Sequence, residues 1–144
     1  MENNFNMEFL SLSENEAFAR MVCAAFVSGL DPTVTEVCEL KTAVSEAVTN
    51  AIVHAYPDKN GYVILKGMIK GSDVYITVAD NGIGIEDVQK AREPLYTAKP
   101  EQERSGLGFS IMESFCDEVT VTSRPGCGTT VTLMKKITSC NLKE

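Results

Sequence analysis

Hydrophobic and polar residues alternate along this chain with two different periods, and the period predicts which segments are strands and which are helices. The segments FNMEFLSLS, near the N-terminus, and DVYITVAD, which ends at Asp80, alternate with period two, as strands with one buried face do. Apolar residues recur instead at intervals of three and four over residues 13–30 and 34–55, which predicts two amphipathic helices. The chain is therefore expected to begin as strand, helix, helix.

Residues at the helix ends support both predictions. Ser13 is a favourable N-cap, Glu16 three residues later completes a capping box, and Gly29 marks the exit of the first helix. Pro57 ends the second helix. The apolar positions of the first helix are Phe18, Met21, Val22, Ala25 and Phe26. The expected buried stripe of the second is Val37, Leu40, Val44, Val48 and Ile52.

The second half of the chain adds four more strands and one helix. YVILKGMI and VYITVAD, joined by the turn KGSD, predict a hairpin, and a polar segment over residues 86–105 follows. The helix GFSIMESF and the strands EVTVTS and GTTVTLMKKI complete the chain. Because long βαβ alternation is missing, we expect an α+β two-layer sandwich, with helices on one face of a mixed, mostly antiparallel sheet.

Composition narrows the class of protein. The 144 residues are 44% hydrophobic and 23% charged, which predicts one globular domain over residues 1–144. The net charge of −7 disfavours direct nucleic-acid binding and suits a basic protein partner or a Mg²⁺-bound ligand. Five cysteines without a CxxC pair, and a single histidine, provide no zinc set of the usual spacing. With no signal peptide and no membrane-spanning apolar run, we expect a cytoplasmic protein with reduced thiols.

At three places the chain carries polar residues or glycines that the hydrophobic pattern of the helices and strands does not explain. On the second helix, Glu46 and Asn50 are four residues apart and share one face, and His54 continues the line. Counting by two along VYITVAD puts Asp80 on the apolar face, where a carboxylate requires hydrogen-bond partners. The plainer alternatives are a solvated helix face for the first set and a turn carboxylate for Asp80.

The third place is RSGLGFS, from Arg104 to Ser110, where glycines precede a helix. Amides at a helix N-terminus hold phosphate well, although this segment is neither GxGxxG nor a P-loop, and a plain turn would also explain it. Together the three places are the parts of a nucleotide pocket. Asp80 would accept a hydrogen bond from an amino group such as adenine N6, and Asn50 would place an oxygen on Mg²⁺.

The same motifs resemble those of the GHKL (Bergerat-fold) ATPases, the superfamily of gyrase, Hsp90, histidine kinases and MutL. EAVTN resembles the N box, DNGIG the box that recognises adenine, and GLG the second glycine box, while GTTV is similar to a late strand of the family. VSEAVTNAIVHAY and PLYTAKPEQERSGLGFSIM further resemble the anti-sigma serine kinases of spore-forming bacteria. The resemblance covers nearly the whole chain and implies ATP or ADP and Mg²⁺ as cofactors.

The resemblance also implies a role for each matching residue. Asn50 would ligate Mg²⁺, Glu46 would be the general base toward an attacking hydroxyl, and His54 would flank the ligand. Asp80 would recognise adenine with support from Thr130. The glycines that let the backbone approach the base would be Gly82 and Gly84. The residues that contact the phosphates would be Arg104, Ser105, Gly106 and Gly108.

The partners implied by the resemblance are proteins. A homodimer would hold a sporulation sigma factor inactive and would phosphorylate a serine of an anti-anti-sigma protein. Glu16 and Arg20, on the outer face of the first helix, are candidates for partner docking, and a plain i,i+4 ion pair is the alternative.

Three other functions remain open at this point. The catalytic half of a histidine kinase would have to act in trans, because the lone histidine lies inside the N-box helix. An ATP-gated clamp would need further domains, for which 144 residues leave no room. A non-catalytic module with structural ATP would keep the same motifs.

Overall fold

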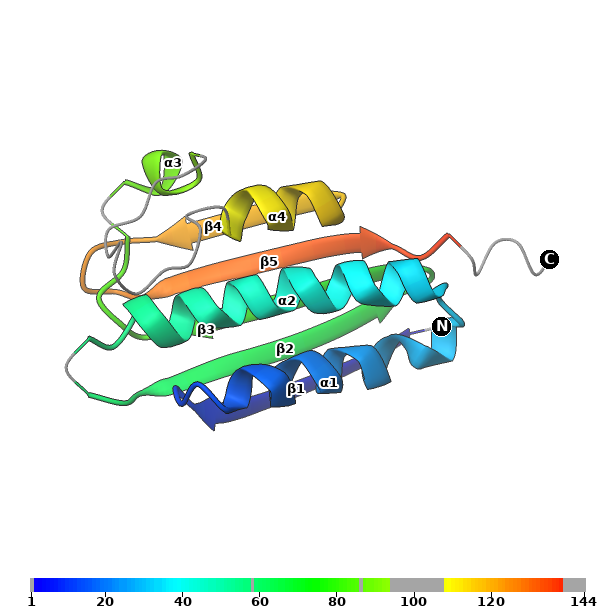
Figure 1. Cartoon of the computed structure of the whole chain (residues 1–144), viewed down its shortest axis with the longest axis horizontal. Helices are drawn as coiled ribbons and strands as arrows, with labels where there is room; N and C mark the ends of the chain where they lie inside the picture. The colour runs from blue at the N-terminus through cyan, green and yellow to red at the C-terminus, as the bar shows by residue number, and fades with distance from the viewer. Residues whose placement is uncertain (1, 58, 86, 94–107, 139–144) are drawn as a thin grey trace.

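The chain folds into two layers, with the helices on one face of a five-stranded sheet (Figure 1). The computed structural model describes residues 2–57, 59–85, 87–93 and 108–138. The first half contains β1 (Glu2–Leu10), α1 (Asn15–Val27), the short 3₁₀ helix η1 (Ser28–Leu30) and α2 (Val34–His54). The second half contains β2 (Tyr62–Lys70), β3 (Asp73–Asp80), α3 (Val88–Ala91), α4 (Gly108–Phe115), β4 (Glu118–Ser123) and β5 (Thr129–Lys136).

The strands lie in the order β1-β2-β3-β5-β4, and each of these four pairings is antiparallel. The predicted α+β two-layer sandwich is therefore confirmed, and the sheet within the described ranges is antiparallel rather than mixed. The β2–β3 hairpin is closed at Gly71, whose φ of +64° is a left-handed conformation that glycine adopts without strain. This order puts β3 at the centre of the sheet.

The core lies between the sheet and α2. Alternate residues of β2 and β3 point toward the helices, as period-two strands with one covered face require. The fully covered apolar residues of these two strands are Val63, Leu65, Ile69, Val74, Ile76 and Val78. The helix residues that meet them include Leu40, Ala43, Val44, Ala47 and Val48. The predicted stripe of α2 is confirmed at Leu40, Val44 and Val48, and alanines complete it.

The predicted apolar positions of α1 are only partly buried, because the helix is rotated by about one residue from the expected orientation. Its buried residues are Ala19, Cys23 and Val27, whereas Phe18 and Met21 are 48% and 58% exposed. Because the side chain of Ala19 is small, α1 packs closely against its neighbours at this position. The larger apolar residues flank this line and cover the edge of the layer, where Phe26 packs edge-on against Phe5.

The capping box predicted for Ser13 and Glu16 does not form. The N-cap of α1 is Glu14, which has no side-chain capping hydrogen bond. A complete capping box occurs instead at α2. The Thr33 hydroxyl accepts from the Glu36 backbone N–H at 3.1 Å, and Glu36 Oε1 accepts from the Thr33 backbone N–H at 2.9 Å.

Glu36 also connects the start of α2 to the end of the sheet. Its second carboxylate oxygen accepts from the backbone N–H of Thr138 at 2.8 Å and from the Thr138 hydroxyl at 3.0 Å. The side chain is 9% exposed, so water replaces these bonds poorly. One carboxylate thus joins residues 33 and 138, which are far apart in sequence.

Replacing Glu36 by alanine is expected to lower the free energy of unfolding by about 2–4 kcal/mol, because a helix cap and two buried hydrogen bonds to carboxylate are lost. Urea unfolding measures the change. Glu14→Ala is the matched control, since Glu14 is an exposed N-cap without a capping bond, and it is expected to change stability by less than about 0.5 kcal/mol. Equal effects of the two substitutions would contradict this assignment.

Candidate functional site

Asp80 is the last residue of β3 and is only 8% exposed. It lies on the covered face together with Ile76 and Val78, as the alternation of the strand predicts. Its Oδ1 accepts a hydrogen bond from the backbone N–H of Gly82 at 2.9 Å. Burial raises the pKa of this carboxyl above its ordinary value, and hydrogen bonds from the backbone of Gly82 and Thr129 oppose that rise. Asp80 is therefore both a turn carboxylate and a buried one.

Thr129, not Thr130, lies beside Asp80. The register of β3 and β5 pairs Asp80 with Thr129 and pairs Ala79 with Thr130. Residues opposite each other share a face and their neighbours alternate, so the side chain of Thr130 is on the uncovered face of the sheet. The assignment of Thr130 as the support of Asp80 is therefore wrong. Thr129 is further held by Ser123, whose Oγ lies 2.8 Å from Thr129 Oγ1.

Glycines at 82 and 84 let the loop after β3 touch two other segments of the chain. A Cβ on Gly82 would lie 2.1 Å from the carbonyl oxygen of Ala55, at the end of α2. A Cβ on Gly84, whose φ is +77°, would lie 2.0 Å from the carbonyl oxygen of Arg124 in the β4–β5 turn. Both glycines are thus required by close packing within this protein, in addition to any approach of a ligand.

The polar face of α2 meets the start of α4 at Gly108. A Cβ on Gly108 would lie 3.1 Å from Glu46 Oε2 and 3.5 Å from Asn50 Nδ2. Glu46 and Asn50 are both half-buried, so the interpretation as a fully solvated helix face does not hold. The structure therefore brings together three residues that the motifs placed in one site: a carboxylate, an amide and a glycine at a helix start.

The remaining predicted residues are not all described by the structure. Arg104, Ser105 and Gly106 lie outside the described residues, so their proposed contacts with phosphate stay predictions. His54 is half-buried in the last turn of α2, one turn after Asn50. Glu16 and Arg20 form the expected i,i+4 ion pair on α1, with Arg20 Nη1 3.4 Å from Glu16 Oε1.

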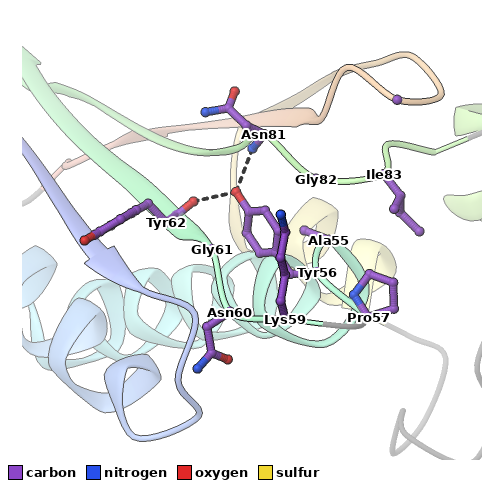
Figure 2. A pocket seen from close by; sticks show the side chains of 11 residues that line it. Ala55, Tyr56, Pro57, Lys59, Asn60, Gly61, Tyr62, Asn81, Gly82 and Ile83 are labelled. Atoms are coloured by element: carbon purple, nitrogen blue, oxygen red, sulfur yellow. Dashed lines mark hydrogen bonds between the residues drawn. The ribbon is translucent and has the colours of Figure 1, made fainter.

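A pocket of about 570 Å³ adjoins the loop that follows Asp80 (Figure 2). It lies between the end of α2, the segment that leads into β2, and the glycine loop after β3. Tyr56, Tyr62 and Asn81 are among the residues that line it. None of these three residues was predicted to be functional, because Tyr56 and Asn81 lie just beyond the ends of α2 and β3 and Tyr62 is simply the first residue of β2.

Three further properties of the described residues concern metal-binding groups, membrane-spanning helices and thiols. Among them no three His, Cys, Asp or Glu side chains gather into a metal-binding group, and none of the helices has the length and hydrophobicity to cross a membrane. Cys23, Cys38, Cys116 and Cys127 are free thiols. Burial raises the pKa of Cys23 to about 12 and that of Cys116 to about 11, so both stay protonated at neutral pH.

The residues gathered around Asp80 and Gly108 fit a nucleotide in their chemistry. Asp80 offers a buried acceptor at the end of the sheet, and a bare glycine at the start of α4 leaves room next to Glu46 and Asn50. Asparagine oxygen is a suitable ligand for Mg²⁺, and the first amides of a helix suit phosphate oxygens. The arrangement of these groups is thus compatible with a bound nucleotide.

Relatives of known name match this chain over nearly their whole length. It is 54% identical over 139 residues to the "Anti-sigma F factor" of Anoxybacillus flavithermus, covering 96% of this chain and 95% of that protein. It is 52% identical to the "Anti-sigma F factor" of Shouchella clausii, covering 96% of each chain. The protein of the same name from Clostridium perfringens is 53% identical, covering 95% of this chain and 99% of that one.

Solved structures share the fold at low sequence identity. The structure of the RsbU and RsbW domains of Rv1364c from Mycobacterium tuberculosis superposes with a TM-score of 0.67 at 16% identity, covering 94% of this chain and 32% of that one. The catalytic domain of the histidine kinase ThkA superposes with a TM-score of 0.59 at 16% identity, covering 92% and 96%. These likenesses concern the fold.

The family comparison agrees with the relatives and with the geometry. Residues 9–135 match the model of the histidine kinase-like ATPase domain, a range that covers every described element from α1 to β4, all of β5 except its last residue, and only the last two residues of β1. The matched range contains Glu46, Asn50, Asp80 and Gly108. The chain therefore belongs to the histidine kinase-like ATPase domain family and, within it, to the anti-sigma F factors.

Proposed function

We propose that this chain is an ATP-dependent protein serine kinase that also acts as an anti-sigma factor. In this proposal it holds a sporulation sigma factor inactive and phosphorylates a serine of an anti-anti-sigma protein. The observation that carries the proposal is the 54% identity over 96% of the chain to a protein named "Anti-sigma F factor", together with the ATPase domain match. The grouping of Glu46, Asn50 and Gly108 is consistent with it.

Glu46 is the proposed general base. As the serine hydroxyl oxygen forms its bond to the γ-phosphorus of ATP, the hydroxyl proton moves to the Glu46 carboxylate. The bond from that phosphorus to the β–γ bridging oxygen breaks, and ADP leaves with the electron pair. Glu46 suits this role because it is half-buried next to the start of α4, where phosphate groups bind well.

Asn50 is the proposed Mg²⁺ ligand, through its side-chain oxygen. A bound Mg²⁺ supplies charge neutralisation for the phosphates of ATP or ADP. Asp80 orients the adenine at the opposite end of the nucleotide, with Thr129 rather than Thr130 beside it. Arg104, Ser105 and Gly106 remain proposed phosphate contacts, and His54 a proposed neighbour of the ligand.

The proposed partners are proteins, and the proposed active form is a homodimer. The net charge of −7 favours association with a basic partner, such as the DNA-binding regions of a sigma factor, over direct binding to nucleic acid. The Glu16–Arg20 pair, on a part of α1 where Phe18 and Met21 are also exposed, is the proposed docking surface. We place the protein in the cytoplasm with these partners.

Two alternatives use the same candidate nucleotide site. A histidine-kinase-like domain acting in trans would phosphorylate histidine, and a non-catalytic module would bind ATP without transferring phosphate. Both would bind nucleotide, so they are distinguished from the serine kinase by whether phosphate is transferred and by which side chain receives it.

Calorimetric titration of the purified chain with ATP and ADP, with and without Mg²⁺, is the first test. We expect micromolar binding of ATP that weakens at least about tenfold when Mg²⁺ is removed, because the phosphates lose their counter-charge. Absence of binding by either nucleotide would overturn the proposed function.

Asp80→Asn is expected to weaken ATP binding by about 1–3 kcal/mol, because a charge-assisted hydrogen bond to adenine is lost. The same substitution is expected to leave the fold intact, since the asparagine oxygen still accepts from Gly82.

The raised pKa of Asp80 means that the folded carboxyl binds a proton more tightly than the unfolded one. The contribution of Asp80 to the stability of the fold therefore becomes less favourable as pH rises from 4 to 7.

Urea unfolding at pH 4 and pH 7 checks this sign. The stability of Asp80→Asn relative to wild type should be more favourable at pH 7 than at pH 4. A difference that is equal at both pH values would show that the carboxyl titrates normally and is not held in a desolvated site.

Glu46→Gln is expected to lower the rate of phosphoryl transfer to serine by about 10²–10⁴-fold, with ATP affinity changed by less than about threefold. The measurement is transfer of radiolabelled phosphate to an anti-anti-sigma protein. Glu39→Gln on the same helix is the matched control, since Glu39 pairs with Lys135 at 3.4 Å. Transfer at the wild-type rate by Glu46→Gln would exclude Glu46 as the base. Labelling of histidine instead of serine would favour the histidine-kinase-like domain that acts in trans.

A further inference from the structure

Tyr56 joins two segments that are separate in sequence, at the wall of the pocket shown in Figure 2. Its hydroxyl donates to the backbone carbonyl of Tyr62 at 2.7 Å and accepts from the backbone N–H of Asn81 at 2.9 Å. Tyr62 begins β2, and Asn81 directly follows Asp80. One hydroxyl therefore holds the start of one strand against the end of its neighbour.

The loop after Asp80 is fixed to the end of α2 at a second point as well. The backbone N–H of Ile83 donates to the carbonyl oxygen of Ala55 at 2.9 Å, and Gly82 lies too close to Ala55 for any side chain. The N–H of Gly82, between these two attachments, donates to Asp80 Oδ1. The orientation of the Asp80 carboxylate thus depends on a loop that is held on one side by Tyr56 and on the other by Ala55.

The ring of Tyr56 is itself held in place by its surroundings. A Cβ on Gly61 would lie 2.3 Å from the ring, so Gly61 packs flat against it. Gly61 is in turn fixed to the end of β1, because its N–H donates to Ser11 Oγ at 3.0 Å and its carbonyl accepts from the Ser11 N–H at 2.9 Å. The hydroxyl is therefore presented to Asn81 by a ring that has little freedom to turn.

We propose that Tyr56 is a positioning residue for adenine recognition, which sets the preference of this site for 6-aminopurines by orienting Asp80. The proposal rests on the proposed function, in which Asp80 accepts a hydrogen bond from the adenine amino group. Inosine triphosphate has a carbonyl oxygen in place of that amino group, so the hydrogen bond from the amino group to the Asp80 carboxylate cannot form. A change in the position of Asp80 should therefore affect ATP and leave inosine triphosphate almost unaffected.

Calorimetric affinities for ATP and inosine triphosphate test this in wild type, Tyr56→Phe, Asp80→Asn and the double variant. Tyr56→Phe is expected to weaken ATP binding by roughly 3- to 10-fold and to change inosine triphosphate binding by less than about twofold. In the Asp80→Asn background the same substitution should change ATP binding by less than about twofold, because the two residues act through one hydrogen bond.

Tyr62→Phe is the matched control. It removes a hydroxyl from the same pocket wall, whereas the bridge uses only the backbone carbonyl of Tyr62. Its affinities for both nucleotides should equal those of wild type. Thermal unfolding of each variant provides a second readout, since a purely structural role for Tyr56 would lower the unfolding midpoint without changing the ratio of the two affinities.

Two results would overturn the role of Tyr56 while leaving the proposed function intact. In both, wild type binds ATP in preference to inosine triphosphate, and Tyr56→Phe either binds ATP normally or loses affinity for both nucleotides in parallel. Failure of the wild type to bind either nucleotide would overturn the proposed function, and with it the role of Tyr56.

Discussion

Three backbone segments meet at the end of β3 so closely that only glycine fits at each contact, and the buried carboxylate of Asp80 lies where they meet. The glycines are Gly82, Gly84 and Gly128. The carbonyl oxygens against which they pack are those of Ala55, Arg124 and Asp80, respectively. Because the loop after β3 contacts both α2 and the β4–β5 turn, a displacement of any of these segments would move the carboxylate. The position of the Asp80 carboxylate therefore depends on tight backbone packing.

The helix α2 carries both the core and the site, on adjacent faces. Leu40, Val44 and Val48 pack on the sheet, and Glu46 and Asn50 point toward the start of α4. An α-helix is stiff over its length, so burial of the apolar stripe also fixes the depth and rotation of the polar face. The capping box and the bonds of Glu36 to Thr138 hold the other end of the same helix. Stability and chemistry are thus coupled through one element.

The solved structures that share this fold at 16% identity show how little of the sequence the architecture requires. A covered face of alternating apolar residues and helices of suitable spacing on that face are sufficient for the two layers. What separates one member of such a family from another lies in the loops and helix ends, where the partner-facing and ligand-facing residues are concentrated. The network around Tyr56 and Asn81 lies at such a helix end and loop.

Local periodicity was enough to predict the order and type of the five strands and of the helices α1, α2 and α4, the single covered face of the sheet and the position of Asp80 on that face. Each of these follows from which side of a strand or helix a residue lies on, and that depends only on neighbours in sequence. The motifs were enough to predict that Glu46, Asn50 and Gly108 lie close together. The orientation of α1, the capping box at Thr33 and the partner of Asp80 needed the tertiary structure. The register of β5 against β3 is set by contacts over about fifty residues of sequence, and a shift of one residue exchanges Thr129 for Thr130. The Tyr56 hydroxyl joins two segments by bonding to backbone groups of Tyr62 and Asn81, and backbone groups carry no signature in the sequence, so only the folded chain could bring them together.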